Sequence, residues 1–219
     1  MTPAVGLGAG GHARVVIDAL RLGKRVEPVA LLDPDPALHN TNVDGVPVLG
    51  GDDRLAGMLG TTATHAFIGI GGARTNEPRR LAFERARASG FVVLTVVHPS
   101  AVVAQSATLG AGTVVLAGAV VNAGAAIGDN VIVNTAAIVE HDCRIGDHAH
   151  VATGARLGGT VTVGEGAHVG LGASVRQGIV IGRHAIVGGG AMVVDDVPDG
   201  AVVVGVPARI LSRSIDRGV

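Results

Sequence analysis

A six-residue hydrophobic period runs through the second half of the sequence and constrains its fold more than any other feature. From Val103 to Val193, every sixth residue is Val, Ile or Leu, with no change of phase. These sixteen positions are Val103, Leu109, Val115, Val121, Ile127, Val133, Val139, Ile145, Val151, Leu157, Val163, Val169, Val175, Ile181, Val187 and Val193. Ala occupies ten of the fifteen positions that lie four residues further along. An α-helix repeats at about 3.6 residues and an alternating strand at about 2, so the pattern predicts neither.

A strict hexapeptide period is typical of a parallel β-helix. Each hexapeptide would supply a short strand and a corner, with the large aliphatic residue pointing inward and the small residue allowing the turn. Three hexapeptides close one triangular coil, and successive coils stack about 4.8 Å apart. The span 103–193 therefore predicts about five coils. The three aromatic residues, Phe67, Phe83 and Phe91, all precede the repeat, as expected if its interior is too narrow for rings.

Residues 1–98 lack this period and are predicted to form a small α/β domain with a parallel βαβ sheet. Apolar runs predict strands at 4–7, 29–32, 66–70 and 92–97, and amphipathic runs predict helices at 13–22 and 77–89. We place the β-helix at 99–194 and a C-terminal extension at 195–219.

A Gly-rich turn joins the first predicted strand to the first predicted helix. Gly6, Gly8, Gly10 and Gly11 lie in this turn, which exposes backbone N–H groups at the start of a helix, where phosphate binds. Asp33 follows the second strand, where a carboxylate can accept hydrogen bonds from a ribose or a base. A full dinucleotide site needs a larger sheet, so the domain fits a mononucleotide better, such as the nucleoside diphosphate of an activated sugar.

Charge and cysteine content exclude several functions. The chain has 17 basic and 18 acidic residues, which argues against non-specific binding to nucleic acid and against a basic membrane surface. We expect no transmembrane span and no signal segment, and hence a cytoplasmic protein. The single cysteine, Cys143, excludes an internal disulfide and falls on the small inward phase, which predicts a buried side chain.

His141 is the candidate general base. It follows the inward Val139 by two residues, so its side chain is expected to point outward, and its stacked neighbours are Ala123 below and Gly159 above. Small neighbours leave space for a substrate, and histidine exchanges protons near neutral pH. Glu140 or Asp142 could orient the ring, although adjacent side chains on a strand diverge unless the chain bends there.

Other histidines also stack along the coils. His150 and His168 are 18 residues apart, and His148 and His184 are 36 apart. These pairs could form polar ladders, the edge of a ligand site or metal ligands. Some hexapeptide-repeat proteins are zinc-dependent carbonic anhydrases, but no acidic insertion loop is present, so acyl transfer is favoured and no metal is expected.

Several motifs together resemble the nucleotide-sugar acetyltransferases of the hexapeptide, or left-handed β-helix, superfamily. This group contains sialic-acid O-acetyltransferase-like proteins and the bacillosamine and perosamine N-acetyltransferases. The resemblance covers nearly the whole chain, and the residues that carry it are Gly8–Val16, His98–Ala101, Asn134–Thr135, Glu140–Asp142 and Gly205–Arg209. It implies a left-handed β-helix, a homotrimer with active sites between subunits, acetyl-CoA as co-substrate and a nucleotide-linked amino sugar as acceptor. GDP-perosamine is the favoured acceptor, and a UDP-4-amino sugar is another.

The resemblance also implies roles for individual residues. His141 matches the catalytic base, and Asp142 stands where the family often has Glu, which leaves its orienting role open. Substrate binding is implied for Gly10, Gly11, His12, Asp33, Pro34, Gly71 and Asn134. Contact with the CoA arm or its thioester is implied for His150, Gly159 and Gly188.

The expected reaction is direct acetyl transfer, with His141 taking a proton from the sugar amine as the amine attacks the thioester. Three alternatives stay open at this stage. The acceptor could be a sugar hydroxyl, the protein could be a zinc-dependent hydratase, or the solenoid could be a non-catalytic scaffold. The sequence does not identify the base of the nucleotide.

Overall fold

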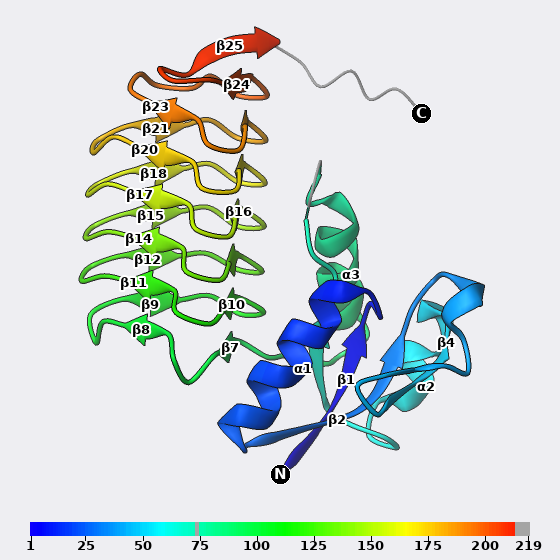
Figure 1. The fold of residues 1–219 in the computed structure, drawn as a ribbon. Coiled ribbons are helices and arrows are strands. Elements are labelled where there is room, and N and C mark those ends of the chain that lie inside the picture. Colours follow the sequence, from blue (N-terminus) through cyan, green and yellow to red (C-terminus); the bar gives the residue numbers. More distant parts are fainter. Residues whose placement is uncertain (73–74, 213–219) are drawn as a thin grey trace.

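A computed structural model describes residues 1–72 and 75–212 as a small α/β domain beside a tall β-helix (Figure 1). The N-terminal domain lies against the lower coils, and the C-terminal strands close the opposite end of the stack. No helix among the described residues is long and apolar enough to cross a membrane.

The N-terminal domain is built on a six-stranded sheet with the order β3-β4-β2-β1-β5-β6. Its strands are β1 (Thr2–Leu7), β2 (Val26–Leu32), β3 (Asn42–Val43), β4 (Val46–Gly50), β5 (His65–Ile68) and β6 (Val92–Val93). All neighbouring pairs are parallel except the β3–β4 hairpin. The sequence analysis predicted the parallel strands but not this hairpin, whose strands are short and include Pro47.

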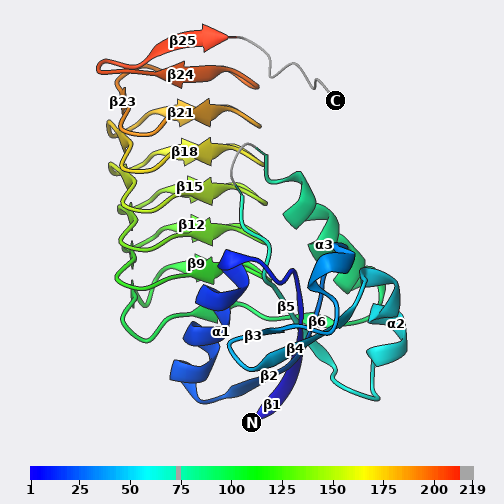
Figure 2. The same ribbon diagram turned by 45° about the vertical axis from the view of Figure 1, so that its right-hand side comes forward.

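Helices cover both faces of this sheet (Figure 2). α1 (Gly11–Gly23) packs on one face and α3 (Glu77–Ala88) on the other, together with the short α2 (Leu55–Met58). The α1 layer also contains Val96, Val114 and Leu116, whose side chains lie on the outside of the first coils. One continuous apolar layer therefore joins the small domain to the β-helix.

The β-helix has three parallel sheets, one for each side of the triangular coil. We call them face 1, face 2 and face 3, in the order in which the chain visits them. Face 1 contains β7 (Val96–Val97), β10 (Val114–Val115), β13 (Ile132–Val133), β16 (His150–Val151), β19 (His168–Val169), β22 (Ile186–Val187) and β24 (Val202–Val204), with β25 (Arg209–Ser212) added antiparallel at the end. Face 2 contains β8 (Val102–Val103), β11 (Val120–Val121), β14 (Ile138–Val139), β17 (Arg156–Leu157), β20 (Ser174–Val175) and β23 (Met192–Val193). Face 3 contains β9 (Thr108–Leu109), β12 (Ala126–Ile127), β15 (Arg144–Ile145), β18 (Thr162–Val163) and β21 (Val180–Ile181).

The interior of the coils follows the hexapeptide phase. Fourteen of the sixteen predicted inward residues are buried in one core cluster, and the remaining two, Val103 and Leu109, pack against it at the open end of the stack. Cys143 is buried in the same cluster, as its phase predicted. The prediction of an α/β domain followed by a left-handed parallel β-helix is confirmed.

The predicted strand at 92–97 is wrong, because the chain forms two strands there. β6 pairs with β5 in the small sheet, whereas β7 pairs with β10 in the β-helix. Val93 belongs to the core of the small domain and Val96 packs in the layer under α1, so the chain must change sheets between them. The coil stack thus extends beyond the range 99–194, with β7 at one end and β24 at the other.

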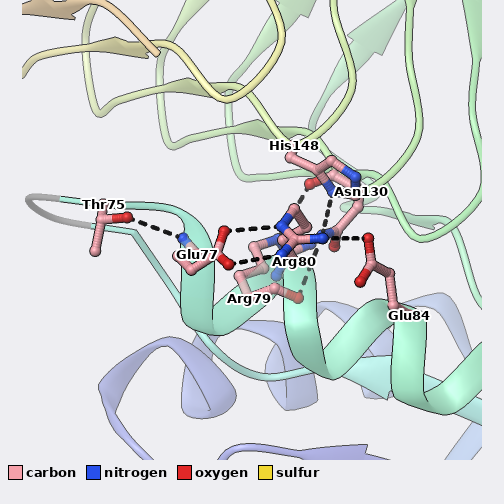
Figure 3. A network of polar contacts seen from close by, with 7 residues as sticks. All are labelled: Thr75, Glu77, Arg79, Arg80, Glu84, Asn130 and His148. Atoms are coloured by element: carbon pink, nitrogen blue, oxygen red, sulfur yellow. Dashed lines mark hydrogen bonds and ion pairs between the residues drawn. The ribbon is translucent and has the colours of Figure 1, made fainter. Parts of the chain in front are cut away.

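Arg79 joins the two parts of the molecule from the inside (Figure 3). Its side chain is 1% exposed and donates four hydrogen bonds to backbone carbonyls. Two acceptors, Ile68 and Ile70, belong to the small domain, and two, Gly112 and Asn130, belong to the coils, at 2.8–3.2 Å. Burial lowers the pKa of Arg79 to about 9.

Candidate functional site

A cleft of about 440 Å³ runs along face 1 beside the small domain. Ala152, Leu171 and Ile186 give it an apolar wall together with the strand at Val187, whose side chain points into the coil core, and glycines 170, 188 and 189 add no side chain to that wall. Its polar groups come from Asn134, His150 and His168, and Gly72 of the small domain completes the lining. The cleft therefore combines an apolar channel with a few convergent polar groups, as small-molecule sites do. Three residues predicted from the sequence, Asn134, His150 and Gly188, lie in it.

His150 is the most constrained side chain in the cleft. It is 4% exposed, and its Nε2 lies 3.1 Å from Nδ2 of Asn134. The ring of His168 meets it edge-on, with 4.8 Å between ring centroids and an interplanar angle of 90°. Burial, with smaller contributions from His168, His12 and Arg79, lowers the pKa of His150 to about 3. The ring is therefore neutral at physiological pH.

The Gly-rich turn lies at the start of α1. Gly10 is the N-cap, no side chain caps the helix, and its first turn has no acidic residue. A Cβ added at Gly10 or Gly11 would meet no atom within 4 Å, so packing does not require glycine there. Among the described residues no side chain caps these backbone N–H groups, which suits an anion, and the phosphate site at Gly10 and Gly11 stays a prediction. Gly8 is different, because its φ of +98° and the nearby Ile70 require glycine.

His12 and Gly71 connect this turn to the loop after β5. A Cβ added at Gly71 would lie 3.3 Å from Cβ of His12, so these two predicted residues lie side by side. His12 is largely buried, and burial followed by the charge of Arg79 lowers its pKa to about 3. Next to them, a Cβ at Gly72 would lie 2.0 Å from Oδ1 of Asn76 and 3.2 Å from Nδ1 of His150. The turn is thereby linked through this loop to the cleft.

Asp33 accepts two hydrogen bonds from backbone N–H groups. Ala9 donates to its Oδ2 at 2.7 Å and Asp35 donates to its Oδ1 at 2.9 Å. The first bond attaches the end of β2 to the Gly-rich turn, so the predicted ribose or base position lies directly beside the predicted phosphate position. Pro34 follows at an exposed bend.

His141 lies outside the cleft, at the corner between face 2 and face 3. Its Nδ1 is 2.9 Å from Oδ2 of Asp142, and the side chains are 58% and 64% exposed. Asp142 has a φ of +58°, and this bend lets the carboxylate reach the preceding ring. Glu140 instead accepts hydrogen bonds from Asn122 Nδ2 and from the backbone N–H of His141. Of the two candidate carboxylates, the geometry therefore pairs Asp142 with the ring.

Gly159 lies directly above His141, as the 18-residue stacking predicted. A Cβ added there would lie 2.5 Å from Nε2 of His141, so only glycine leaves room for the ring in this position. Gly159 was predicted to contact the CoA arm, but within one chain its neighbour is the candidate base.

One chain brings together only part of the predicted site. Asn134, His150 and Gly188 share the cleft on face 1, whereas His141, Asp142 and Gly159 lie at the corner opposite to that face. The sequence analysis did not select Asn76 or Arg79. Arg79 shares a helical spacing with the buried Ala82, Phe83 and Ala86, and this spacing is the signal that could have found it. His168 was noted for its stacking on His150 but was not assigned to the site.

Comparisons with known proteins identify the family to which the chain belongs. Residues 6–86 match the family model of the PglD N-terminal domain. The crystal structure of PerB from Caulobacter crescentus in complex with CoA and GDP-perosamine is similar, with 42% identity, coverage of 97% of this chain and 98% of that one, and a TM-score of 0.89. The acetyltransferase domain of PglB from Neisseria gonorrhoeae has 36% identity, coverage of 96% and 100%, and a TM-score of 0.88. WeeI from Acinetobacter baumannii has 28% identity, coverage of 96% and 100%, and a TM-score of 0.82. A comparison with curated protein sequences gave no significant match.

The fold and these comparisons define a β-helical acetyltransferase with a small N-terminal α/β domain. With 42% identity over almost the full length of both chains, the protein belongs to the hexapeptide-repeat nucleotide-sugar acetyltransferases.

Proposed function

We propose that this protein transfers the acetyl group of acetyl-CoA to the amino group of a nucleotide-linked amino sugar, with GDP-perosamine as the favoured acceptor. The observation that carries the proposal is the match to PerB, whose crystal structure holds CoA and GDP-perosamine. The acetyltransferase domain of PglB, which has also been crystallised with acetyl coenzyme A, supports the same donor.

The two ligands have separate places in this proposal. The nucleoside diphosphate binds at Gly10, Gly11 and His12, with its ribose or base near Asp33 and Pro34. The pantetheine arm of acetyl-CoA lies in the apolar cleft on face 1, which is open at Gly188 and polar at Asn134 and His150. Gly71 lies beside His12 and precedes Gly72 of the cleft lining, so the sugar would extend from one place to the other along this loop.

His141 acts as general base in the proposed reaction. Its imidazole takes a proton from the sugar amine as the nitrogen attacks the thioester carbonyl carbon. The C–S bond then breaks, and CoA leaves as the thiolate, which accepts a proton. Asp142 holds the ring through Nδ1, so Nε2 is the nitrogen that accepts the proton. General base catalysis of this kind contributes about 10²- to 10⁴-fold.

We propose a homotrimer as the active form. Within one chain, His141 lies at the corner opposite to face 1, so it cannot serve the cleft of its own subunit. A neighbouring copy could bring its His141 corner to that cleft and complete the site. Sedimentation equilibrium measures the oligomeric state. In a second experiment, an inactive His141→Ala protein is mixed with an inactive His150→Ala protein so that mixed trimers form. If sites are shared between subunits, some sites combine an intact His141 with an intact cleft and activity returns, whereas a mixture that stays inactive contradicts the shared site.

The compartment and the domain limits follow from the same proposal. Acetyl-CoA and nucleotide sugars are cytoplasmic metabolites of biosynthesis, so we place the protein in the cytoplasm. The small domain holds the nucleotide sugar, and the β-helix, which runs from β7 to β24 and so beyond the predicted range 99–194, carries acetyl transfer.

A direct assay tests the function. Purified protein is mixed with acetyl-CoA and either GDP-perosamine, a UDP-4-amino sugar or the matching sugar without an amino group, and the release of free thiol is followed. Turnover with an amino sugar and a product acetyl group that persists in mild base support N-acetylation. A base-labile product would indicate an ester instead, and no turnover with any nucleotide amino sugar would overturn the proposal.

A further inference from the structure

The amide of Asn134 has only one orientation that satisfies its neighbours. The backbone N–H of Thr135 can only donate, and it lies 2.8 Å from Oδ1 of Asn134. Because that oxygen faces a donor, the amide nitrogen is the atom that faces the ring of His150, at 3.1 Å. The oxygen and nitrogen positions are thus fixed by a backbone group that cannot reverse its role.

This orientation determines the tautomer of His150. An amide nitrogen donates and does not accept, so Nε2 of His150 must offer its lone pair. In a neutral imidazole the proton is then on Nδ1. The ring of His150 has little freedom to rotate, because the residue is 4% exposed and the ring of His168 packs edge-on against it, with 4.8 Å between ring centroids.

The Nδ1–H group faces the cleft wall at Gly72. A Cβ at Gly72 would lie 3.2 Å from Nδ1, and a hydrogen bond with the Gly72 backbone is the smallest influence on the His150 pKa, opposing its lowering by burial. That bond is weak, because neither it nor any other from the residues that the structure describes reaches Nδ1 with ordinary hydrogen-bond geometry. A buried N–H without a strong partner is available to an oxygen of a ligand in the cleft.

We propose that Asn134 is a positioning residue, which holds His150 in the Nδ1–H tautomer so that the ring presents a hydrogen-bond donor inside the cleft. The use of that donor rests on the proposed function, in which the nearest suitable acceptor is the carbonyl oxygen of the acetyl thioester. The tautomer itself does not depend on which ligand binds.

Nitrogen NMR of the imidazole rings tests the proposal on the full-length protein without ligand. Long-range ¹⁵N–¹H correlations on protein labelled at histidine distinguish a protonated ring nitrogen from an unprotonated one, and the His150→Gln variant identifies the His150 signals by their loss. In the unaltered protein we expect Nδ1 protonated and Nε2 unprotonated at pH 7. A proton on Nε2 of His150 in the unaltered protein would overturn the proposal without the need for any variant.

Asn134→Asp adds a second measurement. A carboxylate keeps the acceptor for Thr135 but cannot donate to the ring, so a proton should appear on Nε2 of His150. Asn122→Asp is the matched control, because Asn122 makes the same bond to the next backbone N–H, from Ala123 at 2.9 Å, but faces Glu140 instead of a ring. The His150 signals should not change in that control. If Nε2 of His150 stays unprotonated in folded Asn134→Asp, the role given to Asn134 is contradicted. Failure of the acetyl-transfer assay alone would affect only the proposed function.

Discussion

Asp142 accepts a hydrogen bond from Nδ1 of His141 at 2.9 Å, although the two residues are adjacent in the chain. The contact depends on the left-handed backbone at Asp142, whose φ is +58°. In that conformation the carboxylate turns back over the preceding ring, which fixes Nε2 as the free nitrogen. Asp142 lies on Gly124 of the coil below, where a Cβ would come within 2.5 Å of Oδ1.

Replacement of Asp142 by Asn should lower the turnover of acetyl transfer. The amide keeps the size of the carboxylate but loses the charge that stabilises the protonated ring, and we expect kcat to fall by about 10²-fold with KM nearly unchanged. Steady-state kinetics with acetyl-CoA and the nucleotide amino sugar measure this. Asp195→Asn, at an exposed carboxylate near Arg209, is the control and should keep full activity. Equal activity of both variants would remove Asp142 from the mechanism.

Loss of Arg79 should destabilise the whole protein. Arg79→Met removes four hydrogen bonds and leaves buried carbonyls in both parts of the molecule without a donor, which we expect to lower the free energy of unfolding by about 3 kcal/mol. Urea denaturation followed by circular dichroism measures the loss. Arg80→Met is the neighbouring control, since Arg80 pairs with Glu77 and Glu84 on the surface and should have a much smaller effect. Similar losses in the two variants would contradict the role given to Arg79.

Two buried histidines should make the protein less stable in acid. The pKa values of His12 and His150 fall from 6.5 to about 3 in the folded state. Below pH 6.5 the unfolded chain therefore binds protons that the folded chain does not, so stability decreases as the pH falls from 6.5 toward 3. Both histidines should therefore steepen the loss of stability on the acid side of pH 6.5.

Urea midpoints measured between pH 4 and 7 check this dependence. The single variants His12→Gln and His150→Gln should each flatten the acid side of the curve, and the double variant should flatten it more than either one but not by their simple sum, because His12 contributes to the lowered pKa of His150. A curve of unchanged slope in the double variant would show that these histidines do not account for acid sensitivity.

Gly159→Ala should impair catalysis more than stability. The added methyl group would lie 2.5 Å from Nε2 of His141, and the exposed ring can move aside at little cost, so the candidate base would leave its position. We expect kcat to fall at least tenfold while the thermal midpoint changes little. Gly57→Ala, where the methyl group meets no atom within 4 Å, is the control. If Gly159→Ala keeps full activity, the reaction does not depend on this position of the His141 ring.

The coil interior could be predicted from the sequence almost residue by residue. A hexapeptide phase specifies which side chain points inward, and stacking by 18 residues specifies its neighbours, as the contact of His141 with Gly159 illustrates. The reach of Asp142 to His141 could not be predicted, because it depends on a backbone bend at a residue other than glycine. The break between β6 and β7 could not be predicted from local sequence either. It arises because Val93 packs in one hydrophobic core and Val96 in another.

The cleft could not be predicted from the sequence and is visible only in the folded structure. Its wall combines Gly72 of one part with residues of face 1 of the other, and no sequence spacing relates the two. Asn134 and His150 were found by resemblance, but their mutual hydrogen bond depends on the orientation of an amide that only its neighbours in space can fix.

The buried guanidinium of Arg79 restricts movement of the small domain relative to the coils. Its acceptors belong to both parts of the molecule, and no carboxylate among the described residues forms an ion pair with it, so a swing of the small domain away from the coils would break its hydrogen bonds to Gly112 and Asn130. Such a movement is therefore costly, and we expect the cleft beside the small domain to keep its width when ligands enter and products leave.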